Sequence, residues 1–311
     1  MAKIVKIFCV ISIIALLNLP HSHAQEKAAD EKGQAPGMFE IVQDAKKTII
    51  FIGTVEGKDK ITFYATGFLV QVQGYYHLLT AKHVIADRNT GKLKDEDMYA
   101  FFNLKDGRMA ARKIKELKKV SNADWIFHEN AQVDIAILPF PIDLQTDDVK
   151  FVPENLFTSP DKIFELYDVF FLSYQPAGEF ETKISPIFRV GAISSINDDK
   201  TFYVDAFAFP GNSGSPVFLK PSPIRFYKGG ITMGKDFLGG TFIGIIGEYI
   251  PYQEVAVSAQ TGRPRVMFEE NTGLSKVWSV DYIKQILDSD SFKEQLNRIK
   301  KMTSPKKTAS W

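Results

Sequence analysis

Short apolar segments, separated by turn residues, make up most of the chain between residues 48 and 249. Turn signals such as Gly57-Lys58-Asp59 and Lys105-Asp106-Gly107 end one segment and precede the next. Many short strands with turns at such spacing are typical of an all-β barrel or sandwich. The predicted strands are residues 48–55, 61–72, 75–80, 98–104, 108–117, 133–139, 168–174, 187–196, 201–209, 217–219 and 241–249.

The segments around these strands follow other patterns. Residues 143–162 are polar and contain prolines, which indicates a connector between two β units. Residues 251–273 show no clear period and predict a surface loop or hairpin. Apolar positions at helical spacing in residues 280–287 predict a C-terminal helix, which residues 292–299 extend. Four apolar positions in residues 39–45 predict one face of a short helix before the first strand.

The first 24 residues have the pattern of a secretory signal peptide. Lys3 and Lys6 precede an apolar run over residues 7–19, and the small residues Ser22 and Ala24 mark a cleavage site after Ala24. The run is shorter than the roughly 20 apolar residues of a spanning helix. We therefore expect an exported protein of bacterial type, periplasmic or extracellular, with no membrane span after cleavage.

Composition narrows the classes of function. The chain has 311 residues, of which 45% are hydrophobic and 24% charged, with a net charge of +1. This is an ordinary globular composition with no electrostatic preference for nucleic acid. The single cysteine, Cys9, lies in the predicted signal, so the cleaved chain has neither disulfide nor cysteine metal site. His128-Glu129 lacks the second histidine of a zinc helix, and we expect no metal and no cofactor.

The loop Pro210-Gly211-Asn212-Ser213-Gly214-Ser215-Pro216 lies between two predicted strands. A serine with small neighbours can present its hydroxyl and adjacent backbone N–H groups to one point in space, as a nucleophile beside an oxyanion hole requires. The same residue types also form ordinary turns. The interpretation therefore depends on whether the rest of the chain supplies a base and an acid.

Three histidines remain after signal cleavage. His77 alternates within a predicted strand and is expected to be structural, and His128 lies in a polar loop. His83 ends a strand where the chain turns outward, and is the candidate base. Asp134 lies in an apolar strand, where a carboxylate is costly to bury unless it is paired. An imidazole N–H is a suitable partner, although an edge-of-strand aspartate facing water is the alternative.

Chain order then separates the known hydrolase designs. An α/β-hydrolase has its histidine after the serine, and no histidine follows Ser213. A subtilisin needs an aspartate before the histidine, and the nearby candidates, such as Asp59, lie in charged turns. The order His83, Asp134, Ser213 is that of chymotrypsin.

Four motifs, at residues 65–70, 79–84, 133–138 and 211–216, resemble those of the trypsin-like serine peptidases, in particular the exported bacterial, HtrA-like branch. The resemblance spans about residues 48–287. It implies an all-β fold of two six-stranded antiparallel β-barrels, chymotrypsin-like, followed by a C-terminal helix. It implies a serine-type endopeptidase with a triad of His83, Asp134 and Ser213, and an oxyanion hole formed by the backbone N–H groups of Gly211 and Ser213. Protein or peptide is the expected substrate.

The sequence patterns and this resemblance together divide the chain into consecutive parts. HtrA relatives carry a PDZ domain after the protease, and we expect none here. The predicted parts are a signal peptide at 1–24, a flexible lead-in with a short helix at 25–47, a first β-barrel at 48–150, a second at 151–278, a C-terminal helix at 279–300 and a disordered basic tail at 301–311.

Two departures from the digestive enzymes of the family are informative. Asn212 replaces the aspartate that pairs with a newly freed N-terminus, so we expect activity without that trigger. Phe207, six residues before the nucleophile, is expected at the pocket floor, with Ile246 and Gly247 on one wall. Since no acid is evident there, a small or apolar residue is expected before the scissile bond. The alternative function is a catalytically silent, protease-fold binding protein.

Overall fold

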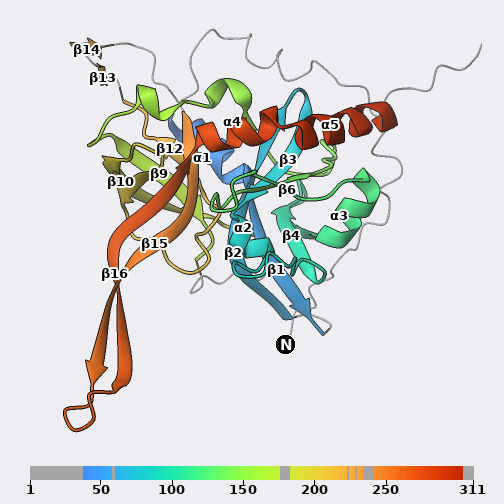
Figure 1. Ribbon diagram of the computed structural model, residues 1–311. Coiled ribbons are helices and arrows are strands. Elements are labelled where there is room, and N and C mark those ends of the chain that lie inside the picture. Colours follow the sequence, from blue (N-terminus) through green and yellow to red (C-terminus); the bar gives the residue numbers. More distant parts are fainter. Residues whose placement is uncertain are drawn as a thin grey trace, which may run out of the picture.

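The computed structural model describes residues 38–57, 60–175, 183–222, 224–227, 230–233 and 241–303. Within them the chain forms two β units, with two C-terminal helices across one side and a long β-arm projecting from the second unit (Figure 1). The predicted signal peptide, residues 25–37 of the lead-in and residues 304–311 of the tail lie outside the described residues.

The first unit is a sheet of eight strands. Its order is β5-β4-β1-β2-β3-β7-β6, and β8 pairs in parallel with β2. Helix α1 (Met38–Lys47) precedes it, in agreement with the short helix predicted there. The strands are β1 (Ile49–Glu56), β2 (Lys60–Val72), β3 (Tyr75–Thr80), β4 (Met98–Asn103), β5 (Met109–Lys113), β6 (Ile126–Phe127), β7 (Ala136–Pro139) and β8 (Val152–Pro153).

The second unit is a closed barrel of six strands in the order β10-β11-β16-β15-β12-β9. Two short 3₁₀ helices, Glu154–Leu156 and Pro160–Lys162, connect the units. The strands of the barrel are β9 (Asp168–Ser173), β10 (Ile187–Ile196), β11 (Phe202–Asp205), β12 (Pro216–Leu219), β15 (Phe242–Val257) and β16 (Pro264–Ser279). A separate hairpin pairs β13 (Ile224–Tyr227) with β14 (Gly230–Met233).

The predicted all-β fold with two β units and a C-terminal helical segment is confirmed. The strand count of the first unit differs, because the two-residue strands β6 and β8 are too short to show an apolar period. Strand β8 also lies beyond residue 150, the predicted end of the first unit, yet it pairs with β2. Residues 108–117 were expected to be extended throughout, but α3 (Ile114–Ser121) begins after β5 because Ile114, Leu117 and Ser121 bury one helical face.

One large apolar cluster joins the two units. The Phe68 ring from β2 lies 5.2 Å from Phe242 of β15, and Phe51 of β1 lies 5.3 Å from Tyr174, which follows β9. All of these side chains are buried. Because interiors pack at high density, such a shared core holds the two units in one arrangement. The cleft between them is thus built on a rigid base.

The C-terminal segment folds back over the first unit as two helices, α4 (Val280–Asp288) and α5 (Asp290–Thr303). Gln295 on α5 accepts the Asp124 N–H at 3.0 Å and donates to the Asp124 carbonyl at 3.1 Å. Helix α5 ends at Thr303, so residues 301–303 are helical and do not belong to the predicted disordered tail. None of the helices in the described residues is long and apolar enough to cross a membrane.

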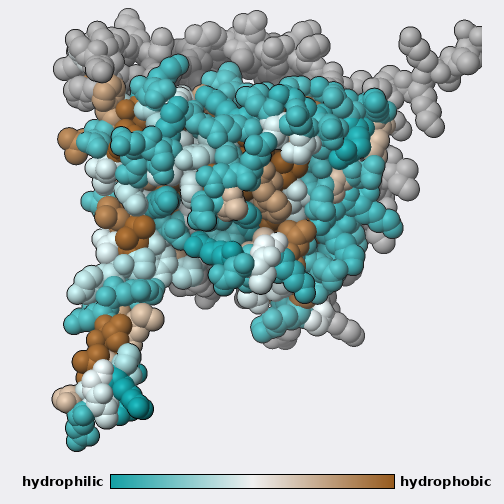
Figure 2. Space-filling view, viewed as in Figure 1, coloured by the Kyte–Doolittle hydropathy of each residue, from teal (hydrophilic) through white to brown (hydrophobic). Residues whose placement is uncertain are grey.

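Residues 251–273, expected as a loop or hairpin, form the outer half of the β15–β16 hairpin. The two strands stay paired out to Val257 and Pro264. Beyond the barrel they project as a two-stranded arm (Figure 1), along which apolar side chains are exposed (Figure 2). The exposed apolar residues of the arm are Tyr252, Val255, Val257, Val266, Met267 and Phe268.

Candidate active site

His83 and Asp134 meet at the end of the first sheet. Strand β3 ends at Thr80, and the short helix α2 (Lys82–Ile85) turns His83 outward, while Asp134 lies two residues before the start of β7. Asp134 accepts two bonds from His83: Oδ1 from the backbone N–H at 2.8 Å and Oδ2 from Nδ1 at 2.6 Å. Because a carboxylate only accepts, Nδ1 carries a proton, and in the neutral imidazole the lone pair is then on Nε2.

Burial disfavours the charged form of Asp134, but the hydrogen bonds and charge of His83, together with the charge of Arg88, hold its pKa below the ordinary value. The carboxylate is therefore ionised at neutral pH. An ionised Asp134 fixes the tautomer and orientation of the imidazole and stabilises the imidazolium when it forms.

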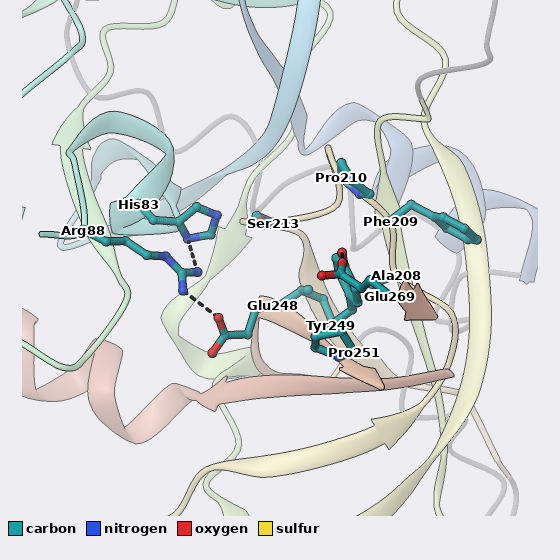
Figure 3. A pocket seen from close by; sticks show the side chains of 11 residues that line it. His83, Arg88, Ala208, Phe209, Pro210, Ser213, Glu248, Tyr249, Pro251 and Glu269 are labelled. Carbon is teal, nitrogen blue, oxygen red and sulfur yellow. Dashed lines mark hydrogen bonds and ion pairs between the residues drawn. The ribbon is translucent and has the colours of Figure 1, made fainter. Parts of the chain in front are cut away.

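Arg88 joins the two sides of the cleft. Its guanidinium lies 3.6 Å from Asp134 Oδ2 and donates to Glu248 Oε2 of β15 at 2.7 Å. A third contact, 3.2 Å to His83 Nδ1, is drawn in Figure 3. Since Nδ1 already carries a proton for Asp134, that third contact is electrostatic and contains no hydrogen bond.

Ser213 lies across the pocket mouth from this pair. Figure 3 shows the His83 ring facing Ser213, and both residues line the same pocket. The turn before Ser213 is closed by the Asn212 N–H, which donates to the Phe209 carbonyl at 2.9 Å. Pro210 precedes Gly211, whose φ is +101°. A proline and a positive-φ glycine, placed between the two residues that such a hydrogen bond joins, are the pattern of a type II turn.

The turn type determines where the Gly211 N–H points, because types I and II differ by a flip of the central peptide. Among the described residues, neither the Gly211 N–H nor the Ser213 N–H donates to a protein acceptor. Both groups lie in the loop beside the pocket. The oxyanion hole expected from these two groups stays a prediction.

Two polar side chains hold this loop. The Thr66 hydroxyl on β2 donates to the Gly211 carbonyl at 2.7 Å and accepts the Tyr174 N–H at 2.9 Å. The Asn212 side chain is fully buried: its Oδ1 accepts the Phe209 N–H at 2.9 Å, and its Nδ2 donates to the Tyr174 carbonyl at 2.6 Å. Groups of both β units thus stabilise the loop conformation.

Gly214 brings the loop against the first unit. Its φ is +86°, and a Cβ there would lie 2.1 Å from the Thr66 carbonyl oxygen and 2.5 Å from the Thr80 hydroxyl. No larger residue fits without displacing the backbone of β2. The glycine therefore sets the distance between the Ser213 loop and the strand that leads to His83.

A pocket of about 350 Å³ opens beside Ser213 and His83. The predicted Ile246 lines it. Phe207 does not: it is 54% exposed and stacks on Phe209 outside the pocket. Gly247 does not either, because its side-chain position faces the Trp278 indole at 2.8 Å. The remaining lining residues are Arg88, Ala208, Phe209, Pro210, Glu248, Tyr249, Pro251 and Glu269.

The other two histidines lie elsewhere. His77 is buried in β3 with its ring 5.1 Å from Phe292, and burial lowers its pKa to about 4, so it is a neutral core residue as expected. His128 bonds Gln285 of α4 at 2.6 Å. Within the described residues, no group of three or more His, Cys, Asp or Glu side chains is arranged to hold a metal ion.

The sequence profile of the family described as "Trypsin-like peptidase domain" matches residues 65–221, just over half of the chain. The chain belongs to the trypsin-like peptidase family. The matched range of this peptidase contains His83, Asp134 and Ser213, together with Thr66 and the whole of the loop at residues 210–216.

The similarity of this peptidase to individual proteins is low. A solved structure, the serine endoprotease from Yersinia pestis, shares 14% sequence identity with it at a TM-score of 0.46, over 84% of this chain and 69% of that chain. No curated protein matches the sequence.

Sequence reasoning missed three residues of the site. Thr66 lies in a recognised motif, but its hydroxyl contacts are 108 and 145 residues away along the chain. Arg88 and Glu269 lie in polar segments that carry no periodic signal. The one local signal for Arg88 was its basic side chain five positions after the candidate histidine.

Proposed function

We propose that this trypsin-like peptidase is a serine endopeptidase, with Ser213 as nucleophile, His83 as general base and Asp134 as the orienting carboxylate. The observation that carries the proposal is the two-point contact of Asp134 with His83, which fixes the orientation of the imidazole, together with the His83 ring facing Ser213. Membership of a peptidase family implies a protein or peptide substrate.

In the proposed reaction, Nε2 of His83 takes the Ser213 hydroxyl proton as Oγ attacks the scissile carbonyl carbon. The carbonyl oxygen becomes an oxyanion, which accepts hydrogen bonds from the N–H groups of Gly211 and Ser213. The proton then passes from His83 to the leaving amine as the C–N bond breaks, leaving an acyl-enzyme. A water molecule, deprotonated by His83, then attacks the acyl carbon. The bond from that carbon to Ser213 Oγ breaks, Oγ takes the proton back from His83, and the second product leaves with a new carboxyl group.

The alternative is a binding protein of the same fold without turnover. It would be favoured by a loop in which the Gly211 N–H is turned away or occupied. The positive φ of Gly211, together with the lack of an acceptor for its N–H among the described residues, supports turnover instead.

A fluorophosphonate probe tests this proposal directly. We expect labelling of Ser213 in the wild type and none in Ser213→Ala. His83→Ala should reduce peptide hydrolysis by roughly 10⁴-fold or more. Ser215→Ala is the matched control, because the Ser215 hydroxyl is buried, is two residues away and has no hydrogen-bond partner. Folded wild-type protein that resists the probe would favour the binding protein.

Export is a second part of the proposal, and it rests on the N-terminal pattern alone. We propose cleavage after Ala24 and release of the folded chain outside the cytoplasm. N-terminal sequencing of the recovered protein should then begin at Gln25. Full-length protein retained in the cytoplasm would contradict it.

A further inference from the structure

The β15–β16 arm leaves the barrel with apolar side chains that the described part of the chain does not cover. Figure 1 shows the arm projecting away from both β units, and Figure 2 shows apolar residues along it. All residues from 264 to 270 are exposed, and Val266, Met267 and Phe268 each expose more than half of their surface. An isolated two-stranded hairpin is marginally stable in water, and three or more strands are usually needed. The arm therefore lacks the neighbour that would stabilise it.

The backbone edge of β16 is free along the arm. Strand β11 pairs with β16 only from Leu274 to Val277, whereas β15 pairs with it out to Pro264. Among the described residues, positions 264–270 thus have a strand neighbour on one side alone. An unpaired edge that carries apolar side chains is a template for pairing with another chain.

The sequence of this edge is complementary to itself in the antiparallel direction. When two copies of β16 pair about a two-fold axis at Met267, Arg265 of each copy lies opposite Glu269 of the other. Val266 lies opposite Phe268 in the same way. Residues directly opposite each other in an antiparallel pair share one face of the sheet, and opposite charges or apolar pairs there are stabilising. In this register each charge meets its opposite and each apolar residue meets an apolar one.

Other pairings of the arm lack this match. An axis moved by one residue to Val266 would put Arg265 opposite Met267 and Pro264 opposite Phe268. The edge of β15 carries one charge between residues 252 and 257, which is Glu254, and no cation. Self-pairing of that edge therefore gives no pair of opposite charges. Charge complementarity selects the β16 edge, with its axis at Met267.

Glu269 can accept a new partner without losing the contacts that it has. The Tyr249 hydroxyl donates to Oε1, and Gln253 donates to Oε2 at 2.9 Å. A carboxylate has about four acceptor sites, so two of those on Glu269 remain open. Within the described residues, neither Glu269 nor Arg265 forms an ion pair.

We propose that the β16 edges of two arms join two copies of this peptidase into a two-fold dimer, with the arms forming one four-stranded sheet. Such an interface is isologous, so every contact occurs twice except the one at the axis. The proposal does not depend on the chemistry at Ser213. Because two strand edges and their side chains make up the contact, its area lies at the low end for specific interfaces, and we expect a dimer that dissociates on dilution.

Charge exchange tests the register. Sedimentation of the wild type over a dilution series should show an equilibrium between monomer and dimer. Arg265→Glu puts like charges opposite each other at two symmetry-related points, so the dissociation constant should rise on the order of tenfold or more. Adding Glu269→Arg restores opposite charges in exchanged positions and should return the dissociation constant close to that of the wild type. Arg263→Glu is the matched control, because Arg263 precedes β16 and faces no carboxylate in this register.

A single thiol tests the axis. Cys9 is the one cysteine of the sequence, so Met267→Cys made together with Cys9→Ser has its thiol at the axis alone. Opposite residues of an antiparallel pair have Cβ atoms about 4.5–5.5 Å apart, close to the roughly 3.5–4.5 Å of a disulfide. Mild oxidation should therefore give a covalent dimer. Thr261→Cys in the same background is the control: Thr261 lies outside β16, in the turn of the hairpin, and should not cross-link.

The outcomes are distinct. Wild-type protein that sediments as a monomer throughout the dilution series, with no cross-linking of Met267→Cys, would overturn the proposal. A dimer that Arg265→Glu leaves unchanged would also overturn it, because the contact would then lie elsewhere on the molecule. Fluorophosphonate labelling of Ser213 should be equal in the wild type and in Arg265→Glu, because Arg265 does not line the pocket. Equal labelling confirms that loss of the dimer does not arise from unfolding.

Discussion

The conformation of Gly211 offers a sharp test of the site, because one methyl group should separate activity from stability. Gly211 has φ +101° at the third position of the turn closed by Phe209 and Asn212. An L-residue in the left-handed region costs roughly 1–2 kcal/mol. In Gly211→Ala the turn avoids this strain by changing from type II to type I, which flips the Pro210–Gly211 peptide and turns the N–H out of the proposed oxyanion hole.

The two effects differ in size. Loss of one oxyanion donor reduces kcat by about 10²–10³-fold, equivalent to about 2.7–4 kcal/mol in the transition state. The free energy of unfolding should fall by no more than the roughly 1–2 kcal/mol of strain. The expected result is therefore a folded protein with a Tm lowered by only a few degrees, slow fluorophosphonate labelling and a large loss of kcat.

The assay combines peptide hydrolysis, probe labelling and thermal unfolding of the same preparations. Gly107→Ala is the control: Gly107 also has a positive φ of +85°, and a Cβ there meets nothing within 4 Å. It should show the strain alone and keep full activity. If Gly211→Ala stays within a few-fold of wild-type kcat while folded, the assignment of its N–H to the oxyanion hole is wrong.

Three further predictions concern buried polar groups. Asn212→Asp replaces the Nδ2 donor to the Tyr174 carbonyl with a carboxylate. At pH 7 the free energy of unfolding should fall by about 3–5 kcal/mol, as for a buried unpaired charge, and it should recover in part at acid pH, where the carboxylate is protonated. Urea unfolding at pH 7 and at acid pH measures both effects. Thr66→Val leaves the Gly211 carbonyl and the Tyr174 N–H without their hydrogen-bond partner. Each such group costs about 1–3 kcal/mol, so the free energy of unfolding, measured with a denaturant, should fall by roughly 2 kcal/mol or more, and activity should fall with it. An unchanged free energy of unfolding would refute the role of Thr66 in holding the loop. Burial lowers the pKa of His77 from 6.5 to about 4. The unfolded chain therefore binds a proton before the folded chain does, and stability is lost as the pH falls from about 6.5 to about 4. Over that range the free energy of unfolding of the wild type should fall by about 3 kcal/mol more than that of His77→Phe, and parallel pH profiles of the two proteins would contradict this.

The fold class and the positions of His83, Asp134 and Ser213 could be predicted from local sequence patterns. His83 ends a strand, Asp134 precedes one, and Ser213 lies in a glycine-rich loop, so each has a signal within a few residues. Glu269 has no such signal, because its place in the pocket depends on the pairing of β16 with β15 and on Gln253 opposite it. Phe207 was misplaced for a similar reason: position in a motif does not determine which face of an extended segment points outward.

The contact between Thr66 and Gly211 has a consequence for how the loop around Ser213 forms. Its two residues are 145 positions apart, and closing so long a loop costs entropy that only later contacts offset. Thr66 belongs to the first β unit and Gly211 to the second, so this bond can form only when both units are in place. The conformation of the loop around Ser213 therefore depends on the assembly of the two units and not on either unit alone.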